Sequence, residues 1–412
     1  MTNLSPGFKS YPKAGVISVM EEAAKLGFSY TNPNWCNLGQ GGPELAEIDG
    51  CIPRINQINL SCAQHGYAPV AGLPELRQKV ADLYNFFFRQ EKSLQYSGKN
   101  VLIGGGGRLV LSRIMGSFDN IKLGFFNPDY ASYKGIMNVF NNVEPVEFRL
   151  DPKKNFQVDL AQFEKFIVDN NIQAFLISNP CNPTGAVIQG DQLKELVDLA
   201  EKLNFSLIID EFYFNHIYSN GEQKMVSVAE FIEDIENTPI ILVAGLSKAF
   251  RYPGWRLCWA LGPANTIENI SSVSSFLDGG ASHPIQAAAL QLIETDKLLQ
   301  ETIAIHHRYK LKRDYMIQQL NEMGLSASIP DGAFYVWVNL ESLTSPLNDG
   351  HEFFKAGLKK QVIVVPGEFF DLRKNINREE NLFRKYIRLS FSPTLEVVKM
   401  GMEKIREIIT DN

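Results

Sequence analysis

Four short apolar runs in the middle of the chain constrain the fold most strongly. They read IQAFLIS (172–178), FSLIID (205–210), IILVA (240–244) and LCWAL (257–261). Uninterrupted apolar runs of this length indicate strands that are buried on both faces, as in a parallel sheet. A helical pattern over 192–203 separates the first two runs. This order of strand, helix and strand predicts an α/β fold, with a three-layer large domain whose helices cover a mostly parallel sheet.

Two stretches predict amphipathic helices. The apolar residues of 192–203 recur at a spacing that places them on one helix face: Leu193, Leu196, Val197, Ala200 and Leu203. Asp191 is a candidate N-cap for this helix, because its side-chain oxygen can accept from a free backbone N–H. A second amphipathic helix is expected to begin at Pro74, since proline suits the first position of a helix.

The pattern changes after about residue 290. Helix-like stretches there precede two further apolar runs, YVWVNL (335–340) and QVIVVP (361–366). They indicate a second, smaller α/β domain that the N-terminal segment joins. The predicted division is a large domain of residues 46–290 and a small domain of residues 1–45 and 291–412.

Composition excludes several classes of protein. The formal net charge of the 412 residues is -6, so the chain lacks the basic excess that nucleic acids or anionic membranes attract. The five cysteines form no CxxC pair, which argues against a zinc site or a disulfide framework. No apolar run approaches the roughly 18 residues of a membrane span, and the N-terminus lacks the apolar stretch of a signal peptide. We expect a reduced cytoplasmic protein without a metal.

Polar residues follow the predicted strands at the edge where open α/β sheets bind ligands. The loop NPCNPTG (179–185) is by itself more typical of a simple turn. Asp210 ends a buried strand, so it either forms a salt bridge or faces a ligand cation, and the sequence favours neither. Lys248 follows the strand over 240–244, and Arg256 lies eight residues later.

Together these parts meet the requirements of pyridoxal phosphate. An amine must bond covalently to its aldehyde, and a carboxylate must keep its ring nitrogen protonated. Hydrogen-bond donors must hold its phenolic oxygen. A guanidinium with backbone N–H groups must hold its phosphate.

The chain resembles the class I/II aminotransferase family of fold-type I pyridoxal-phosphate enzymes. The resemblance extends from about residue 37 to 392, and the order and spacing of the motifs make it specific. The motifs that carry it are NLGQGGPEL (37–45), YAPVAGLPELR (67–77), NPCNPTG, DEFY (210–213), SKAFRYPGWR (247–256) and YIRLSFS (386–392). It implies an aminotransferase, which moves an amino group from an L-amino acid to a 2-oxo acid.

The resemblance also implies roles for residues at the cofactor. Lys248 would bond to the cofactor aldehyde and later move the proton at the substrate Cα. Asp210 would pair with the ring nitrogen, while Asn182 and Tyr213 would hydrogen-bond the phenolic oxygen. Tyr130, in NPDYASY, would stack on the ring. A lysine near other positive groups in a partly dry site has a lowered pKa, which suits a nucleophile and base.

Further roles concern anions and the partner subunit. Arg256 would bind the cofactor phosphate, and Arg388 would bind the substrate α-carboxylate bidentately, near Asn182. The backbone near Gly41 is a second candidate contact for the substrate. Tyr67 matches a tyrosine that reaches the phosphate in the neighbouring subunit, so the resemblance implies a homodimer with shared active sites.

The phosphate-binding segments depart from the usual family pattern. Gly245 stands where a serine is common, although Ser247 is retained directly before the lysine. In the run IGGGGRLVL we align Gly106, Gly107 and Arg108 with the phosphate loop. Consecutive glycines favour close approach of the backbone to an anion. Arg108 either adds a second positive charge to the site or lies on a helix surface.

One departure bears on the substrate. Dicarboxylate-specific family members place an arginine from the partner subunit near the position of Asp278. A carboxylate there would repel acidic side chains, so we expect an enzyme that is not dicarboxylate-specific, with a basic or neutral donor side chain. The alternative is that Asp278 is a solvated loop residue.

Two other functions compete with transamination. A lyase that eliminates a β-substituent, of the C–S lyase type, shares the early steps, and pocket contacts decide between the two. A non-catalytic binding homologue is the third hypothesis, because a fold alone does not establish activity. The presence of Lys248, Asp210 and Arg388 together argues against it.

Overall fold

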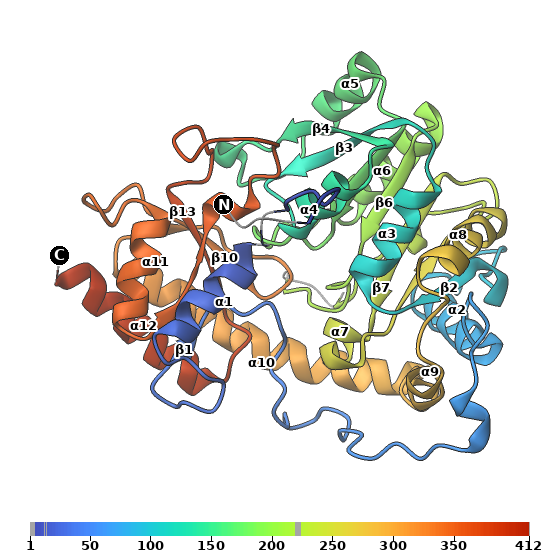
Figure 1. The fold of residues 1–412 in the computed structure, drawn as a ribbon, viewed down its shortest axis with the longest axis horizontal. Helices are drawn as coiled ribbons and strands as arrows, with labels where there is room; N and C mark the ends of the chain where they lie inside the picture. Colours follow the sequence, from blue (N-terminus) through green and yellow to red (C-terminus); the bar gives the residue numbers. More distant parts are fainter. Residues whose placement is uncertain (1–4, 12, 14, 219–223, 412) are drawn as a thin grey trace.

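The computed structural model describes residues 5–11, 13, 15–218 and 224–411. Its largest unit is a seven-stranded sheet with helices packed around it, which can be followed in Figure 1. The strand order is β2-β8-β7-β6-β5-β3-β4. Strands β3 to β7 pair in parallel, whereas β8 is antiparallel to both of its neighbours. The seven strands are β2 (Val101–Gly104), β3 (Ile121–Asn127), β4 (Val143–Arg149), β5 (Ala174–Ser178), β6 (Ser206–Asp210), β7 (Ile240–Gly245) and β8 (Cys258–Leu261).

Helices cover both faces of this sheet. Along β5, Phe175 and Ile177 belong to one hydrophobic cluster, and Ala174 and Leu176 belong to another on the opposite face. Burial on both faces explains why the strand sequences are continuously apolar. The associated helices are α2 (Pro74–Phe88), α3 (Gly107–Ser117), α4 (Ser132–Val139), α5 (Leu160–Asn170), α6 (Asp191–Leu203), α7 (Leu246–Ala249), α8 (Ala264–Leu277) and α9 (His283–Ala289). The predicted α/β fold with a mostly parallel sheet is confirmed.

A smaller unit follows the long helix α10 (Thr295–Glu322), and its antiparallel sheet has the order β12-β13-β10-β9. The N-terminal segment packs with this unit, because β1 pairs in parallel with β11. Its strands are β1 (Cys36–Asn37), β9 (Ser326–Ala327), β10 (Tyr335–Asn339), β11 (Val362–Ile363), β12 (Val365–Pro366) and β13 (Tyr386–Ser390). Its other helices are α1 (Gly15–Lys25), α11 (Gly350–Lys359) and α12 (Leu395–Thr410).

Short 3₁₀ helices occur in several connections of the chain. They are η1 (Cys62–His65), η2 (Gly98–Asn100), η3 (Pro152–Lys154), η4 (Val228–Glu230), η5 (Pro253–Trp255) and η6 (Gly367–Phe370). Within the described ranges, no helix combines the length and the apolar character that crossing a membrane requires.

Three local predictions differ from the structure in detail. Gly190 is the N-cap of α6, and Asp191 is its first helical residue, where a carboxylate still complements the positive end of the helix. The run over 257–261 forms β8, which is antiparallel, because burial on both faces does not determine strand direction. The run over 361–366 divides into two short strands, since β11 pairs with β1 and β12 with β13.

Candidate active site

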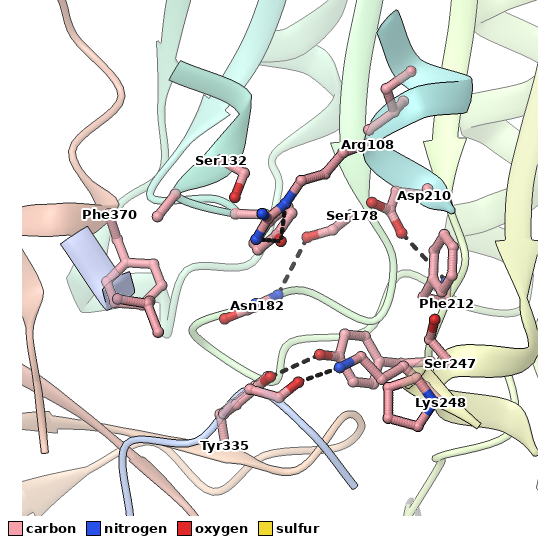
Figure 2. Close-up of a pocket in the computed structure, with 18 of the residues that line it drawn as sticks. Arg108, Ser132, Ser178, Asn182, Asp210, Phe212, Ser247, Lys248, Tyr335 and Phe370 are labelled. Carbon is pink, nitrogen blue, oxygen red and sulfur yellow. Dashed lines mark hydrogen bonds between the residues drawn. The ribbon is translucent and has the colours of Figure 1, made fainter. Parts of the chain in front are cut away.

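A cavity of about 440 Å³ lies where the carboxyl ends of the central parallel strands face the smaller unit. Figure 2 shows Arg108 and Ser132 on one side of it, Lys248 and Tyr335 on the other, and Asn182 between them. Among the described residues that line it, four are cationic and Asp210 is the one carboxylate. The cationic residues are Arg108, Lys248, Arg256 and Arg388. This excess of positive charge suits a site that binds more than one anionic group.

Asp210 ends β6 and is 8% exposed at the base of the cavity. Its Oδ2 accepts a hydrogen bond of 2.8 Å from Tyr133 Oη, and its Oδ1 accepts one of 3.3 Å from the Phe212 N–H. Burial raises the pKa of Asp210 to about 6, because the charged carboxylate is deprived of water. None of the ion pairs in the described part of the chain includes Asp210. Its carboxylate is therefore available to a cationic group in the cavity.

Lys248 follows β7 on the short helix α7, and its amine donates a hydrogen bond to the carbonyl oxygen of Gly41. Burial and the nearby Arg388 lower the pKa of Lys248 to about 7. A substantial fraction of the amine is thus uncharged at neutral pH, which a nucleophile requires. Tight packing positions the turn: a Cβ at Gly245 would lie only 2.6 Å from the Cβ of Cys258. This packing leaves no room for a side chain at Gly245.

An anion site is built where Arg256 meets the N-terminus of α3. Gly106 is the N-cap of this 11-residue helix, with a φ of 113° that side-chain-bearing residues rarely adopt. A Cβ at Gly106 would lie 2.1 Å from Arg256 Nη2, so only glycine leaves room for the guanidinium there. Gly107 and Ser247 also line the cavity beside it. Helix N–H groups and a guanidinium together are the donors that a phosphate prefers.

Arg388 on β13 forms a second anion site. It is 1% exposed, and its guanidinium donates 2.9 Å hydrogen bonds to Asn182 Oδ1 and to the Gly39 carbonyl. Its Nε has no hydrogen-bond partner within the described residues. The ring of Tyr335 lies 4.1 Å from the guanidinium carbon. A buried cation without a carboxylate partner is prepared to receive an anion from a ligand.

The loop that carries Asn182 is rigid. Asn179 exchanges two hydrogen bonds of 2.9 Å with the backbone of Ile188, and these close the loop after β5. The Asn182 N–H donates to Ser178 Oγ at 3.2 Å. Tyr213 lies nearby, with its hydroxyl 2.8 Å from that of Tyr335. Two of the predicted donors for a phenolic oxygen thus come from fixed elements.

Arg108 reaches the cavity from the first turn of α3, although its side chain is largely exposed. Its Nε and Nη2 donate to the hydroxyl of Tyr130 at 3.2 and 2.9 Å. Between the two placements that the sequence left open, the structure puts Arg108 at the cavity rather than on an outer helix surface (Figure 2). This contact also holds Tyr130 at the cavity wall.

Two predicted site residues do not line the cavity of their own chain. Asp278 ends α8, and its carboxylate accepts hydrogen bonds of 3.0 and 2.7 Å from the guanidinium of Arg113. Arg113 is fully buried, so its charge needs this partner. Asp278 thus gives no reason to exclude acidic substrates. Tyr67 is fully exposed and lies away from the cavity.

Several residues of the site could not be predicted from the sequence. Tyr133 reaches Asp210 from α4, and Tyr335 was read as part of an apolar core strand. Three apolar residues, Val16, Ile17 and Phe370, also line the cavity. Neither composition nor spacing marks them, because their roles depend on how distant segments pack. The position of Tyr335 at the start of the predicted strand was the one available signal.

The family model described as aminotransferase class I and II matches residues 33–405. The chain belongs to this family. The protein is therefore an aminotransferase of fold type I, and enzymes of this class and fold use pyridoxal 5'-phosphate. Its own residues fit that cofactor, since an amine, a buried carboxylate and a glycine-lined arginine site meet in one cavity.

Relatives of the aminotransferase cover most of its length. The aspartate/prephenate aminotransferase of Thermus thermophilus is 28% identical over 349 residues, which are 83% of each chain. The aspartate aminotransferase of Pyrococcus abyssi is 26% identical over 380 residues, covering 91% of this chain and 92% of that protein. The structure of aspartate aminotransferase from Thermus thermophilus with maleate has a TM-score of 0.80 at 24% identity. It covers 99% of this chain and 100% of that one, and it supports the fold.

Proposed function

We propose that this aminotransferase moves the amino group of an L-amino acid to a 2-oxo acid through Lys248, and that it is not dicarboxylate-specific. The observation that carries the proposal is the cavity in which the Lys248 amine shares the space with the carboxylate of Asp210 and the buried guanidinium of Arg388. The cofactor aldehyde, the ring nitrogen and the substrate carboxylate need these three groups together.

In this proposal, groups from several elements of the chain would hold the cofactor. Arg256 and the N–H groups at the start of α3, next to Gly106, bind the phosphate. Asp210 accepts from the protonated ring nitrogen. Asn182 and Tyr213 donate to the phenolic oxygen. Tyr130 stacks on the ring, while Gly107 and Ser247 add contacts beside the phosphate.

Lys248 moves the proton. When bound, pyridoxal phosphate supplies an electron-withdrawing ring that accepts the electrons left as the Cα–H bond breaks. The neutral amine of Lys248 would take the proton from the substrate Cα and could release it again, because its pKa of about 7 permits it to gain and lose a proton near neutral pH. The Gly41 carbonyl, which accepts a hydrogen bond from this amine, orients it.

Arg388 holds the α-carboxylate of the substrate. Its guanidinium is fixed by Asn182 and the Gly39 carbonyl, so little conformational freedom is lost on binding. Because the carboxylate stays bound to the arginine, the bond that breaks at Cα is the one to hydrogen. This arrangement supports transamination over decarboxylation.

The side-chain end of the site favours uncharged donors. Val16, Ile17 and Phe370 present apolar surface to the cavity. Relatives are named for aspartate, prephenate and aromatic amino acids, so a donor panel must contain acidic and aromatic members. We infer that an aromatic or aliphatic donor reacts at a rate at least comparable with that of aspartate. Activity confined to aspartate and glutamate would contradict this.

We also infer a homodimer with shared active sites. Support comes from Tyr67, which is fully exposed and so is free to contact the phosphate of a second copy. A monomer in sedimentation equilibrium would refute the dimer.

The proposed domains are 46–290, which contains the seven-stranded sheet, and 1–45 with 291–412, which contain the four-stranded one. A reducing cytoplasm is the proposed compartment, because all five cysteines are free thiols.

A visible absorbance titration tests the activity. The purified protein, loaded with pyridoxal phosphate, receives single amino acids from a panel of aspartate, glutamate, phenylalanine, methionine and ornithine. We expect the yellow band to bleach with a donor and to return when a 2-oxo acid is added. Release of ammonia and pyruvate instead would identify a lyase. A protein that develops no band with added cofactor would reject the role of Lys248.

A further inference from the structure

Tyr133 lies directly beneath the site without lining it. It is fully buried on α4, and its hydroxyl donates to Oδ2 of Asp210 at 2.8 Å. The other donor to that carboxylate is the Phe212 N–H, at the longer distance of 3.3 Å. Tyr133 is therefore the one side chain of the described residues that hydrogen-bonds to Asp210.

The ring of Tyr133 has a second contact. It packs edge-on against Tyr130, with ring centroids 5.3 Å apart and planes at 86°. The Tyr133 N–H also donates to the Tyr130 carbonyl at 2.9 Å, so the two rings project from one tight turn. This turn joins the proposed platform for the cofactor ring to the group that contacts Asp210.

Asp210 needs such a partner. Its burial disfavours the charged carboxylate and raises its pKa, and the hydrogen bond from Tyr133 opposes that effect. Burial also raises the pKa of Tyr133 well above its ordinary value, so its hydroxyl stays protonated and remains a donor. A phenol that is kept neutral beside a buried carboxylate stabilises the ionised form of that carboxylate.

We propose that Tyr133 is a positioning residue, whose hydroxyl holds Asp210 ionised and oriented toward the ring nitrogen of bound pyridoxal phosphate. This inference rests on the proposed role of Asp210. Tyr133 acts through that carboxylate, because its own hydroxyl is already engaged by it. The aromatic contact with Tyr130 fixes the direction from which the hydroxyl donates.

A double-mutant cycle on cofactor affinity tests the proposal. Tyr133→Phe deletes one oxygen atom and keeps the ring packing, while Asp210→Asn removes the charge. The dissociation constant of pyridoxal phosphate is measured by titrating each apoenzyme. We expect Tyr133→Phe to weaken binding roughly tenfold, as for loss of a hydrogen bond to a charged group. In the Asp210→Asn background it should change binding less than about twofold, because coupled residues are not additive.

Tyr84→Phe is the matched control. Tyr84 is also fully buried, and its hydroxyl accepts a 3.3 Å hydrogen bond from Trp259 far from the cavity. Thermal unfolding of both apoenzymes checks that the two phenylalanine variants fold alike. With saturating cofactor, Tyr133→Phe should lower kcat for transamination and leave KM for the amino acid unchanged, since Arg388 is untouched.

Each outcome has a defined meaning. Equal cofactor affinity in Tyr133→Phe and Tyr84→Phe, or an equal loss from Tyr133→Phe in both backgrounds, would overturn the inference about Tyr133. Unchanged affinity in Asp210→Asn alone would instead overturn the proposed role of Asp210. If Tyr133→Phe weakens cofactor binding in the wild-type background but not in the Asp210→Asn background, the roles of both Tyr133 and Asp210 are supported.

Discussion

Gly106 provides a sharp test of the phosphate site. Its φ of 113° with a ψ of 152° belongs to a region that only glycine adopts readily, and alanine there costs about 1–3 kcal/mol of strain. The added Cβ would also lie 2.1 Å from Arg256 Nη2, so the guanidinium must move away from the start of α3. Losing one hydrogen bond to a charged group costs about 1.5–3 kcal/mol. We therefore expect Gly106→Ala to bind pyridoxal phosphate roughly ten- to a hundredfold more weakly.

The assay is a titration of the apoenzyme with pyridoxal phosphate, followed by visible absorbance. Gly105→Ala is the matched control in the same loop, because a Cβ there would meet only Leu109 at 3.7 Å. Pyridoxal, which has no phosphate, should bind similarly to Gly106→Ala and to the unchanged protein. The reasoning is refuted if Gly106→Ala folds and binds pyridoxal phosphate as tightly as Gly105→Ala does.

Three further predictions concern the charged groups of the cavity. Arg388→Lys should raise KM for the amino acid at least tenfold, because the bidentate clamp is lost, and an unchanged KM in steady-state kinetics would contradict its role. Arg108→Gln should weaken cofactor binding, and the resulting loss of rate should be the same for every amino acid donor. A selective loss of rate with aspartate and glutamate would assign Arg108 to the substrate instead. Burial and Arg388 lower the pKa of Lys248 to about 7, so stopped-flow capture of cofactor by the apoenzyme should speed up as pH rises to about 7 and level off above it. A capture rate that still rises steeply above pH 9 would mean that Lys248 has the pKa of an ordinary lysine.

The sequence allowed the four neighbouring strands β5, β6, β7 and β8 of the large sheet to be predicted, for a physical reason, but not β2, β3 or β4. Strands buried on both faces must be apolar throughout, so β5, β6 and β7 were recognisable from composition alone. The direction of β8 was not, because burial is the same for parallel and antiparallel strands. Likewise, the sequence did not determine which residue is the N-cap of α6, because glycine and aspartate both suit a helix start. The N-cap is Gly190, and Asp191 follows it.

The site shows the same division. Asp210 and Lys248 could be predicted because each lies at the end of a recognisable strand, and Arg256 because it follows Lys248 by eight residues, in an order that one cofactor requires. Contacts between distant segments were not found. Tyr133 donates a hydrogen bond to Asp210, which is 77 positions away in the sequence, and Arg113 donates to the carboxylate of Asp278, which is 165 positions away. No local pattern records such pairs, because tertiary packing creates them.

The attachment of the cofactor to Lys248 is the central claim and can be measured directly. The protein loaded with pyridoxal phosphate is reduced with borohydride, digested and examined by mass spectrometry. We predict that the peptide containing Lys248 carries the mass of the reduced cofactor, and that Lys248→Ala carries none and shows no turnover. An unlabelled Lys248 peptide, or a label on another lysine in the active protein, would contradict the account.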